Sequence, residues 1–334
     1  MNTPVTPLTL SDIFEETVTL IGKTFLRNLL LAVIFLTIPL VLMAIAADQF
    51  YSSFAEFHTT IAGKAADASI SSIVSILGEV AFFFFSTLIF GLATLCAQIA
   101  CSIVVSNEMQ TQPVTWQDAL TQTFQQKWIR GVGVLLLQIV IFAGAAIVVG
   151  LGIAILGAFS KILLGLLIVV LILAIIPSIF YFMIKWYFAV VAVAVDDQQV
   201  IAALKQSWNL VNGYWWRTFG LIVLFGLLSQ FIVTIISLPI TFGSMWNVYK
   251  DFFAMLQQTG GNIQPDKMLR FQQSFGPGVA ISSGVSGILT LLMAPVYTVV
   301  FYYDLRARKT PSVDSSTMNT SLTGSKGPLD LNRL

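Results

Sequence analysis

The sequence predicts an all-α integral membrane protein with six transmembrane helices and three amphipathic helices at the cytoplasmic face, in a threefold pseudo-repeat. Of its 334 residues, 57% are hydrophobic and only 10% are charged, and the mean hydropathy is +0.86. Soluble domains carry about 25% charged residues, so an ordinary cytosolic enzyme is excluded. The net charge of +1 excludes the global basic field of a nucleic-acid-binding protein.

Six apolar runs are long enough to cross a bilayer, which takes about 20 residues. They are residues 29–47, 81–105, 132–158, 162–184, 218–240 and 279–301. The fourth run continues, and we interpret residues 186–195 as a helical extension or an interfacial segment. Asp12, Glu15 and Glu16 precede the first run, unlike the basic start of a signal peptide, so we expect the first span to be retained.

The distribution of lysine and arginine predicts the orientation. Twelve of these residues flank one side of the predicted spans and five flank the other. Basic residues concentrate on the cytoplasmic side, so both termini are expected in the cytoplasm. Residues 1–309 are expected to form a single membrane domain. The tail, residues 310–334, has nine Ser/Thr among 25 residues and is predicted to be disordered.

A local repeat marks the start of the chain and its middle. Residues 7–12 (PLTLSD) match residues 113–118 (PVTWQD) at a constant offset of 106. In both, a threonine and an aspartate three positions later have the spacing of a capping box, which satisfies the free amides of a helix start. Both stretches are therefore predicted to begin helices.

Apolar stripes at helical spacing precede each odd-numbered span, in residues 10–25, 116–126 and 198–212. Such helices are expected to lie along the cytoplasmic face, with their cations toward anionic headgroups. The repeating unit is an amphipathic helix, a span, an outside loop and a second span. The units cover about residues 7–106, 113–195 and 196–309.

Two further stretches carry a family resemblance. Residues 202–213 (AALKQSWNLVNG), followed by Trp215-Trp216-Arg217, resemble the motif A-L-x-x-S-W-x-L-x-x-G-x-x-W-R of the bacterial membrane domain attached to some glycerophosphodiester phosphodiesterases. Residues 302–308 (YYDLRAR) are similar to that family's terminal Y-Y-D-L-R-x-R, and residues 9–25 to its first helix. The resemblance implies a protein of the bacterial inner membrane, with a scaffold of uncharacterised role.

Enzymatic activity is not expected. In the phosphodiesterases the chemistry resides in a separate soluble barrel with acidic metal ligands and two histidines, whereas this chain has only His58. Besides His58 the chain has only two cysteines, Cys96 and Cys101, which is too few side chains for a metal site built from His and Cys. The sequence also lacks a phosphate-binding loop, a dinucleotide fingerprint and a nucleophile elbow. We therefore expect no catalytic residues, no metal and no cofactor.

Polar residues inside spans are the first candidates for function in membranes. Gln98, Gln138 and Gln230 either line a substrate path or hydrogen bond between helices, and we favour packing because no ionisable residue sits at mid-bilayer depth. Lys185, at the end of the fourth run, is expected to extend to the headgroups.

An aromatic–arginine cluster is predicted at the cytoplasmic boundary and is the candidate site for anionic lipid. Its members are Trp215, Trp216, Arg217, Tyr302, Tyr303, Arg306 and Arg308. The competing hypothesis is that Asp304 or a backbone carbonyl occupies an arginine, which would make the cluster a structural lock.

Two functions remain open. The first is a non-enzymatic scaffold that binds membrane lipids, a second copy of this protein or a partner membrane protein. We expect it to bind no nucleic acid. The second is a small-molecule transporter or a permease subunit. A carrier is expected to place charges or broken helices at mid-membrane, and this chain places glutamines and prolines there, which favours the scaffold.

Overall fold

The computed structural model describes residues 7–63, 70–159, 161–259 and 275–309, and the predicted disordered tail lies outside these residues. The described chain is built from helices joined by short turns. In chain order they are α1 (Leu10–Gly63), α2 (Ile70–Met109), α3 (Trp116–Gln122), the π-helical turn η1 (Thr123–Lys127), α4 (Trp128–Phe159), α5 (Lys161–Lys185), α6 (Ala189–Asp196), α7 (Val200–Val211), α8 (Trp215–Thr259) and α10 (Phe275–Lys309).

Six helical stretches are long and apolar enough to cross a membrane, which confirms a multi-pass membrane protein. They are Leu10–Phe50, Ile76–Met109, Trp116–Gly152, Leu173–Asp196, Trp215–Gly243 and Ile281–Lys309. Each overlaps one of the six predicted runs. The 54 residues of α1 would extend about 80 Å at 1.5 Å per residue, so α1 exceeds a hydrocarbon core of about 30 Å.

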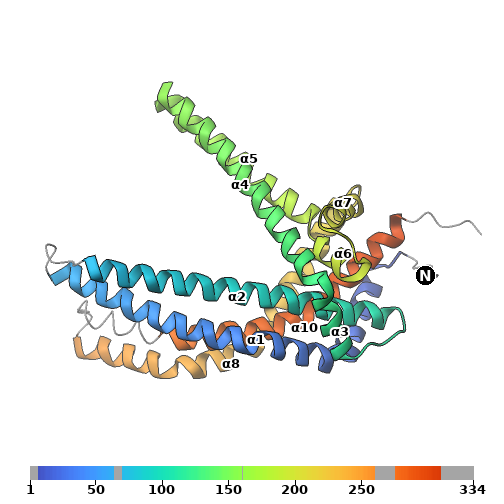
Figure 1. Ribbon diagram of the computed structural model, residues 1–334, viewed down its shortest axis with the longest axis horizontal. Helices are drawn as coiled ribbons and strands as arrows, with labels where there is room; N and C mark the ends of the chain where they lie inside the picture. Colours follow the sequence, from blue (N-terminus) through green and yellow to red (C-terminus); the bar gives the residue numbers. More distant parts are fainter. Residues whose placement is uncertain (1–6, 64–69, 160, 260–274, 310–334) are drawn as a thin grey trace, which may run out of the picture.

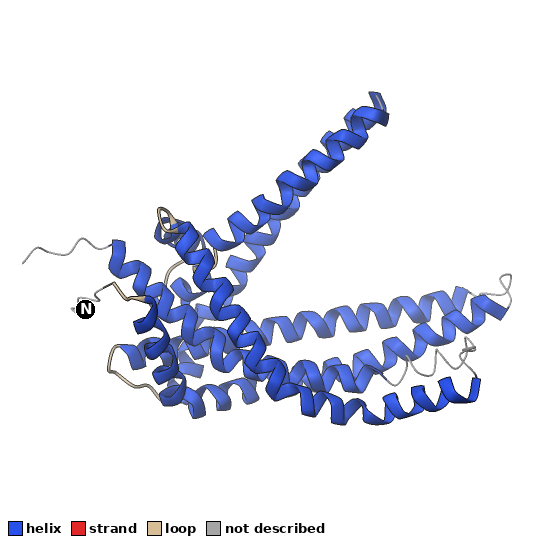
Figure 2. Ribbon diagram, turned by 180° about the vertical axis from the view of Figure 1, so that it is seen from behind, coloured by secondary structure: helices blue, strands red, loops and turns tan. Residues whose placement is uncertain are grey.

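The long helices form two arms (Figures 1 and 2). Helices α1, α2, α8 and α10 run side by side as one bundle, whereas α4 and α5 form a hairpin that points away from it. Helices α3, α6 and α7 lie where the two arms meet. We call this junction the vertex; it comprises residues 7–30, 100–130, 182–219 and 296–309. The main core cluster lies at the vertex and includes Phe188, Ala192 and Phe301.

Burial differs sharply between the arms. In the most apolar stretches of α2 and α10, 56% of the residues are buried. In the most apolar stretch of the span Trp116–Gly152, which contains most of α4, only 6% of the residues are buried. Leu136, Val140 and Val148 of α4 are each more than half exposed. The α4 surface therefore needs an apolar environment that the described chain does not supply.

Residues 186–195 differ from the prediction of a helical extension or an interfacial segment. A turn follows Lys185, and α6 is a separate short helix. Its residues Ala189, Val191 and Val193 are at most 1% exposed. A helix that is apolar on all sides is stable only when surrounded, so α6 packs inside the vertex.

The first predicted amphipathic helix is not a separate element. Residues 10–25 are the first turns of α1, which runs into the span without a break. Gly22 and the β-branched threonines weaken the helix slightly, but the hydroxyls of Thr17 and Thr24 find acceptors within it, the carbonyls of Ile13 and Leu20. No residue in this stretch forces a turn, so the helix continues.

The second and third predicted amphipathic helices do end before the predicted apolar runs that follow them. After α3 the backbone kinks at Gln126, which has φ of 80°. After α7 the chain turns at Gly213, with φ of 86°, a conformation that glycine adopts at little cost. Helix α7 buries Ala203, Leu204 and Leu210 on one face, with Ile201 73% exposed on the other.

Candidate functional site

Three of the arginine–carboxylate pairs at the vertex follow one pattern. Each arginine follows one of the predicted amphipathic helices, and each acid lies at the end of the even-numbered span that follows it. The pairs are Arg27–Glu108 at 2.6 Å, Arg130–Asp197 at 2.9 Å and Arg217–Asp304 at 3.1 Å. Each pair therefore joins the beginning of one predicted repeat unit to a residue close to its predicted end, with Glu108 and Asp197 two positions beyond it.

The same three arginines also donate to a backbone carbonyl just ahead of the next amphipathic helix. The acceptors are Val114 O for Arg27 (3.1 Å), Asp197 O for Arg130 (2.8 Å) and Leu8 O for Arg217 (3.0 Å). Leu8 precedes the first amphipathic helix, so the third unit connects back to the first. The three arginines thus link the units in a closed cycle.

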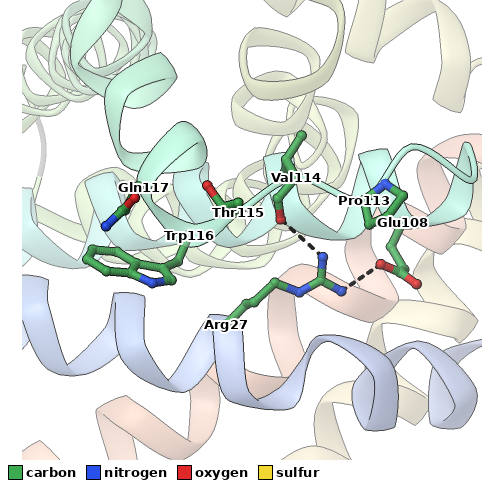
Figure 3. Close-up of a pocket in the computed structure, with 7 residues that line it drawn as sticks. All are labelled: Arg27, Glu108, Pro113, Val114, Thr115, Trp116 and Gln117. Carbon is green, nitrogen blue, oxygen red and sulfur yellow. Dashed lines mark hydrogen bonds and ion pairs between the residues drawn. The ribbon is translucent and has the colours of Figure 1, made fainter.

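The Arg27 node lies in a shallow pocket of about 590 Å³ (Figure 3). Arg27 reaches from α1 between Glu108 at the end of α2 and Val114 of the loop before α3. At the start of α3, the amide of Asp118 donates to Thr115 Oγ1 at 3.2 Å, which completes the predicted capping box. Arg27 therefore binds groups of the protein itself, Glu108 and the carbonyl of Val114. The helix cap at Thr115 stabilises the start of α3, which lines the pocket.

The Asp304 node is the most deeply buried. Its carboxylate is 0% exposed and accepts from the amide of Leu8 at 2.9 Å, from Arg217 Nη2 at 3.1 Å and from Arg308 Nε at 3.1 Å. Arg308 also donates to the carbonyl of Leu8 at 2.7 Å. A buried carboxylate is favourable only when it is paired and hydrogen bonded, and two arginines and one amide meet that condition.

A fourth acid, Asp196, joins α6, α7 and α10. It accepts from Tyr302 Oη at 2.5 Å, from Gln206 Nε2 at 2.6 Å and from Arg306 Nη1 at 2.8 Å. These contacts connect residues on three helices through one carboxylate. Together with the Asp304 node, they fix the end of α10 to the rest of the vertex.

The family model described as "Domain of unknown function (DUF7847)" matches residues 19–305. The chain belongs to this family. The match includes part of every span and all three arginine–carboxylate pairs. No curated protein and no solved structure matches the chain. The resemblance to the phosphodiesterase membrane domain stays a prediction.

In this DUF7847 member, the two tyrosines of the predicted lipid cluster are not at the surface. Tyr302 is 0% and Tyr303 is 8% exposed. Tyr303 Oη shares a hydrogen bond of 2.9 Å with Ser106 Oγ and accepts from Gln110 Nε2 at 2.7 Å. The expectation that these tyrosines contact headgroups was therefore wrong, because their hydroxyls are used inside the protein.

The arginines of the cluster are engaged as well. Arg217 and Arg308 share Asp304, and Arg306 binds Asp196. Their contacts match the structural-lock hypothesis in geometry. Trp216, by contrast, is 77% exposed, as an anchor in a lipid interface would be.

The three glutamines lie apart from one another. Gln98 and Gln138 are partly exposed on α2 and α4, and Gln230 is exposed on α8. Within the described residues, the polar contacts between long helices at the vertex run through side chains such as Tyr303 and Ser106. The described residues also contain no group of three His, Cys, Asp or Glu side chains that could hold a metal ion.

Lys185 does not extend to the surface as expected. It is 2% exposed, and its Nζ donates to Asn212 Oδ1 at 3.2 Å. The ammonium lies 4.8 Å from the ring centre of Trp208 and 5.5 Å from that of Tyr181. A lysine that ends an apolar run normally reaches water, but here Trp208 of α7 and Asn212 at the end of that helix lie against the ammonium. The spacing of residues along the sequence does not indicate that Lys185 is buried.

Proposed function

We propose that this protein is a non-enzymatic membrane scaffold that binds anionic lipid at its vertex, with both termini in the cytoplasm of a bacterial inner membrane. The observation that carries the proposal is the closed cycle of arginine, carboxylate and carbonyl contacts. It ties the ends of all the spanning helices at one side while leaving the two arms apart. Such an arrangement holds helices in a fixed relation and presents their apolar surfaces to the bilayer.

The cycle also supports the threefold pseudo-repeat. Arg27 lies as far from the helix cap at Thr9 as Arg217 lies from the cap at Gln199. In the second unit Arg130 comes three residues earlier relative to Thr115, and η1 interrupts the helix there. Equivalent arginines with equivalent acceptors are expected if one unit was duplicated and then diverged.

The vertex favours a scaffold over a transporter. Alternating access requires one group of helices to rock against the other around the binding site. Separating the third unit from the first would remove the backbone of Leu8 from Asp304, which is fully buried, and from Arg217 and Arg308. Hydrogen bonds to charged groups contribute about 1.5–3 kcal/mol each, so a repeated opening here is strongly disfavoured.

The experiment compares lipid retention and solute flux for the purified protein. Native mass spectrometry in a mixture of phosphatidylglycerol and phosphatidylcholine should show retention of phosphatidylglycerol at roughly tenfold preference, since each cation contributes about 1 kcal/mol toward an anionic leaflet. Proteoliposomes should release entrapped small solutes no faster than empty vesicles. Equal retention of both lipids, or clear solute flux, would overturn the proposal.

A triple variant distinguishes two roles of the arginines: binding lipid, or holding the helices together as a structural lock. Replacing Arg217, Arg306 and Arg308 with glutamine leaves Asp304 and Asp196 without their arginine partners. We expect this variant to lose its fold, measured by size-exclusion chromatography. A folded triple variant that has lost only lipid would show that the arginines serve lipid and not the lock.

A further inference from the structure

We propose that Lys185 and Trp215, with Asn212 and the rings of Tyr181 and Trp208, form a site for a phosphodiester group, occupied in the membrane by the headgroup phosphate of an anionic lipid. The inference rests on the proposed function, because it names where on the vertex the lipid binds. It replaces the arginine cluster, in which each guanidinium group already binds a carboxylate, with a cation that binds no carboxylate in the described part of the chain.

The first argument is the unpaired charge of Lys185. Among the described residues, the charged side chains in the buried class are Lys185 and Asp304. Asp304 has two arginines, whereas Lys185 has no carboxylate within 4.0 Å in the described part of the chain. A buried charge without a counter-charge is unfavourable, and an anionic ligand would add one to the amide and ring contacts that Lys185 already makes.

The second argument is the number of unused donors. An ammonium has three N–H groups, and among the described residues it forms one hydrogen bond, to Asn212 Oδ1. The indole Nε1 of Trp215 is buried and has no acceptor in the part of the chain that the structure describes. Both groups adjoin the same ring: Lys185 Nζ lies 5.5 Å from the centre of Tyr181, and the ring of Trp215 stacks on Tyr181 at 5.8 Å. Both groups are therefore hydrogen-bond donors beside Tyr181, and oxygen atoms of a ligand are the acceptors that they lack.

The third argument concerns the charge of the ligand. A phosphodiester carries one negative charge, which matches the single ammonium of Lys185. A phosphomonoester carries about −1.5 to −2 charges at neutral pH, and the described residues of the site offer no second cation for it. Arg217 and Arg308 bind Asp304 instead.

The fourth argument is the apolar surface beside the site. Phe180 and Met183 on α5 are 55% and 56% exposed, and Trp216 on α8 is 77% exposed. Phe180 and Met183 lie on the same helix as Tyr181, and the ring of Trp216 contacts that of Trp215 at 4.7 Å. Exposed apolar side chains on both helices of the site offer contacts for acyl chains. This combination of apolar surface and buried cation indicates a lipid and not a soluble anion.

The test measures retention of phosphatidylglycerol over phosphatidylcholine by the full-length protein in native mass spectrometry. Lys185→Gln should reduce this preference at least tenfold, and Lys185→Arg should preserve most of it. Lys205→Gln is the matched control, because Lys205 is exposed on α7 at the same vertex, and it should retain the wild-type preference. Trp215→Phe keeps the aromatic ring but removes the N–H, and should reduce the preference several-fold.

Trp215→Phe also keeps the proposal testable if Lys185→Gln fails to fold. If both folded variants retain phosphatidylglycerol as the wild type does, the site is wrong while the scaffold proposal stands. If the wild type itself shows no preference, the scaffold proposal fails as well. A parallel titration with inorganic phosphate distinguishes the sources: displacement of phosphatidylglycerol at millimolar phosphate would overturn the lipid assignment in favour of a free anion.

Discussion

Replacing Asp304 with asparagine tests the physical reasoning about the vertex most directly. The substitution keeps the shape of the side chain and an oxygen for the amide of Leu8, which donates at 2.9 Å. It removes the negative charge that faces Arg217 and Arg308 at 3.1 Å each. The two guanidinium groups, which share the vertex, would then lose the anion between them.

The structure sets the expected magnitude. Asp304 is fully buried, and hydrogen bonds to charged groups contribute about 1.5–3 kcal/mol each. Arg217 and Arg308 are 31% and 21% exposed, so water recovers part of that loss. We therefore expect the free energy of unfolding to fall by about 3–5 kcal/mol, the range for breaking a buried ion pair.

The assay is reversible unfolding of the purified protein in mixed micelles, followed by tryptophan fluorescence. Asp197→Asn is the matched control: it breaks the equivalent pair with Arg130, but Asp197 is 64% exposed. An exposed pair contributes about 0–1 kcal/mol, so this variant should unfold almost as the wild type does. Equal losses for the two variants, or a loss at position 304 that is unchanged when Arg217 is also replaced, would refute the reasoning.

Three further predictions follow from local geometry. Thr115→Ala removes the cap of α3 and should lower the free energy of unfolding by about 1 kcal/mol; an unchanged value would argue against the cap. Gly213→Ala should cost at least about 1 kcal/mol because φ is 86° there, whereas Gly220→Ala, at a helical position with open space around it, should be neutral or stabilising. In a cysteine-free background, a cysteine at Ser325 should resist labelling from outside intact cells and one at His58 should react; the opposite pattern would reverse the predicted orientation.

Local features of the chain were readable from its sequence. The six spans follow from apolar runs, and the structure has a suitable helix at each of them. The predicted capping boxes are also confirmed: Asp12 and Thr9 exchange hydrogen bonds of 2.9 and 3.2 Å, and Thr115 caps α3. Both kinds of feature depend on residues within a few positions of one another.

Other features were predicted incorrectly because local patterns fit more than one arrangement. The stripe in residues 10–25 fits a helix lying on the membrane and equally the first turns of a longer helix. The apolar residues of α6 fit a lipid interface and equally a protein core, and α6 is in the core. Tyr302 resembles an interfacial anchor in the sequence, yet it is fully buried against Asp196. In each case the correct arrangement depends on whether lipid, water or another part of the protein lies against the residues.

By itself, then, the sequence determined a helical, six-span membrane protein with capped helix starts, because hydrophobicity and capping act over one or two helical turns. Only the tertiary structure decided which charges are compensated. Arg217 pairs with Asp304, which is 87 residues away. Lys185 is enclosed by Trp208 of α7 and by Asn212 at the end of that helix. Charge compensation depends on distances between elements that are remote in sequence, so the unpaired cation on which the lipid-site proposal rests became visible only when the helices were packed together.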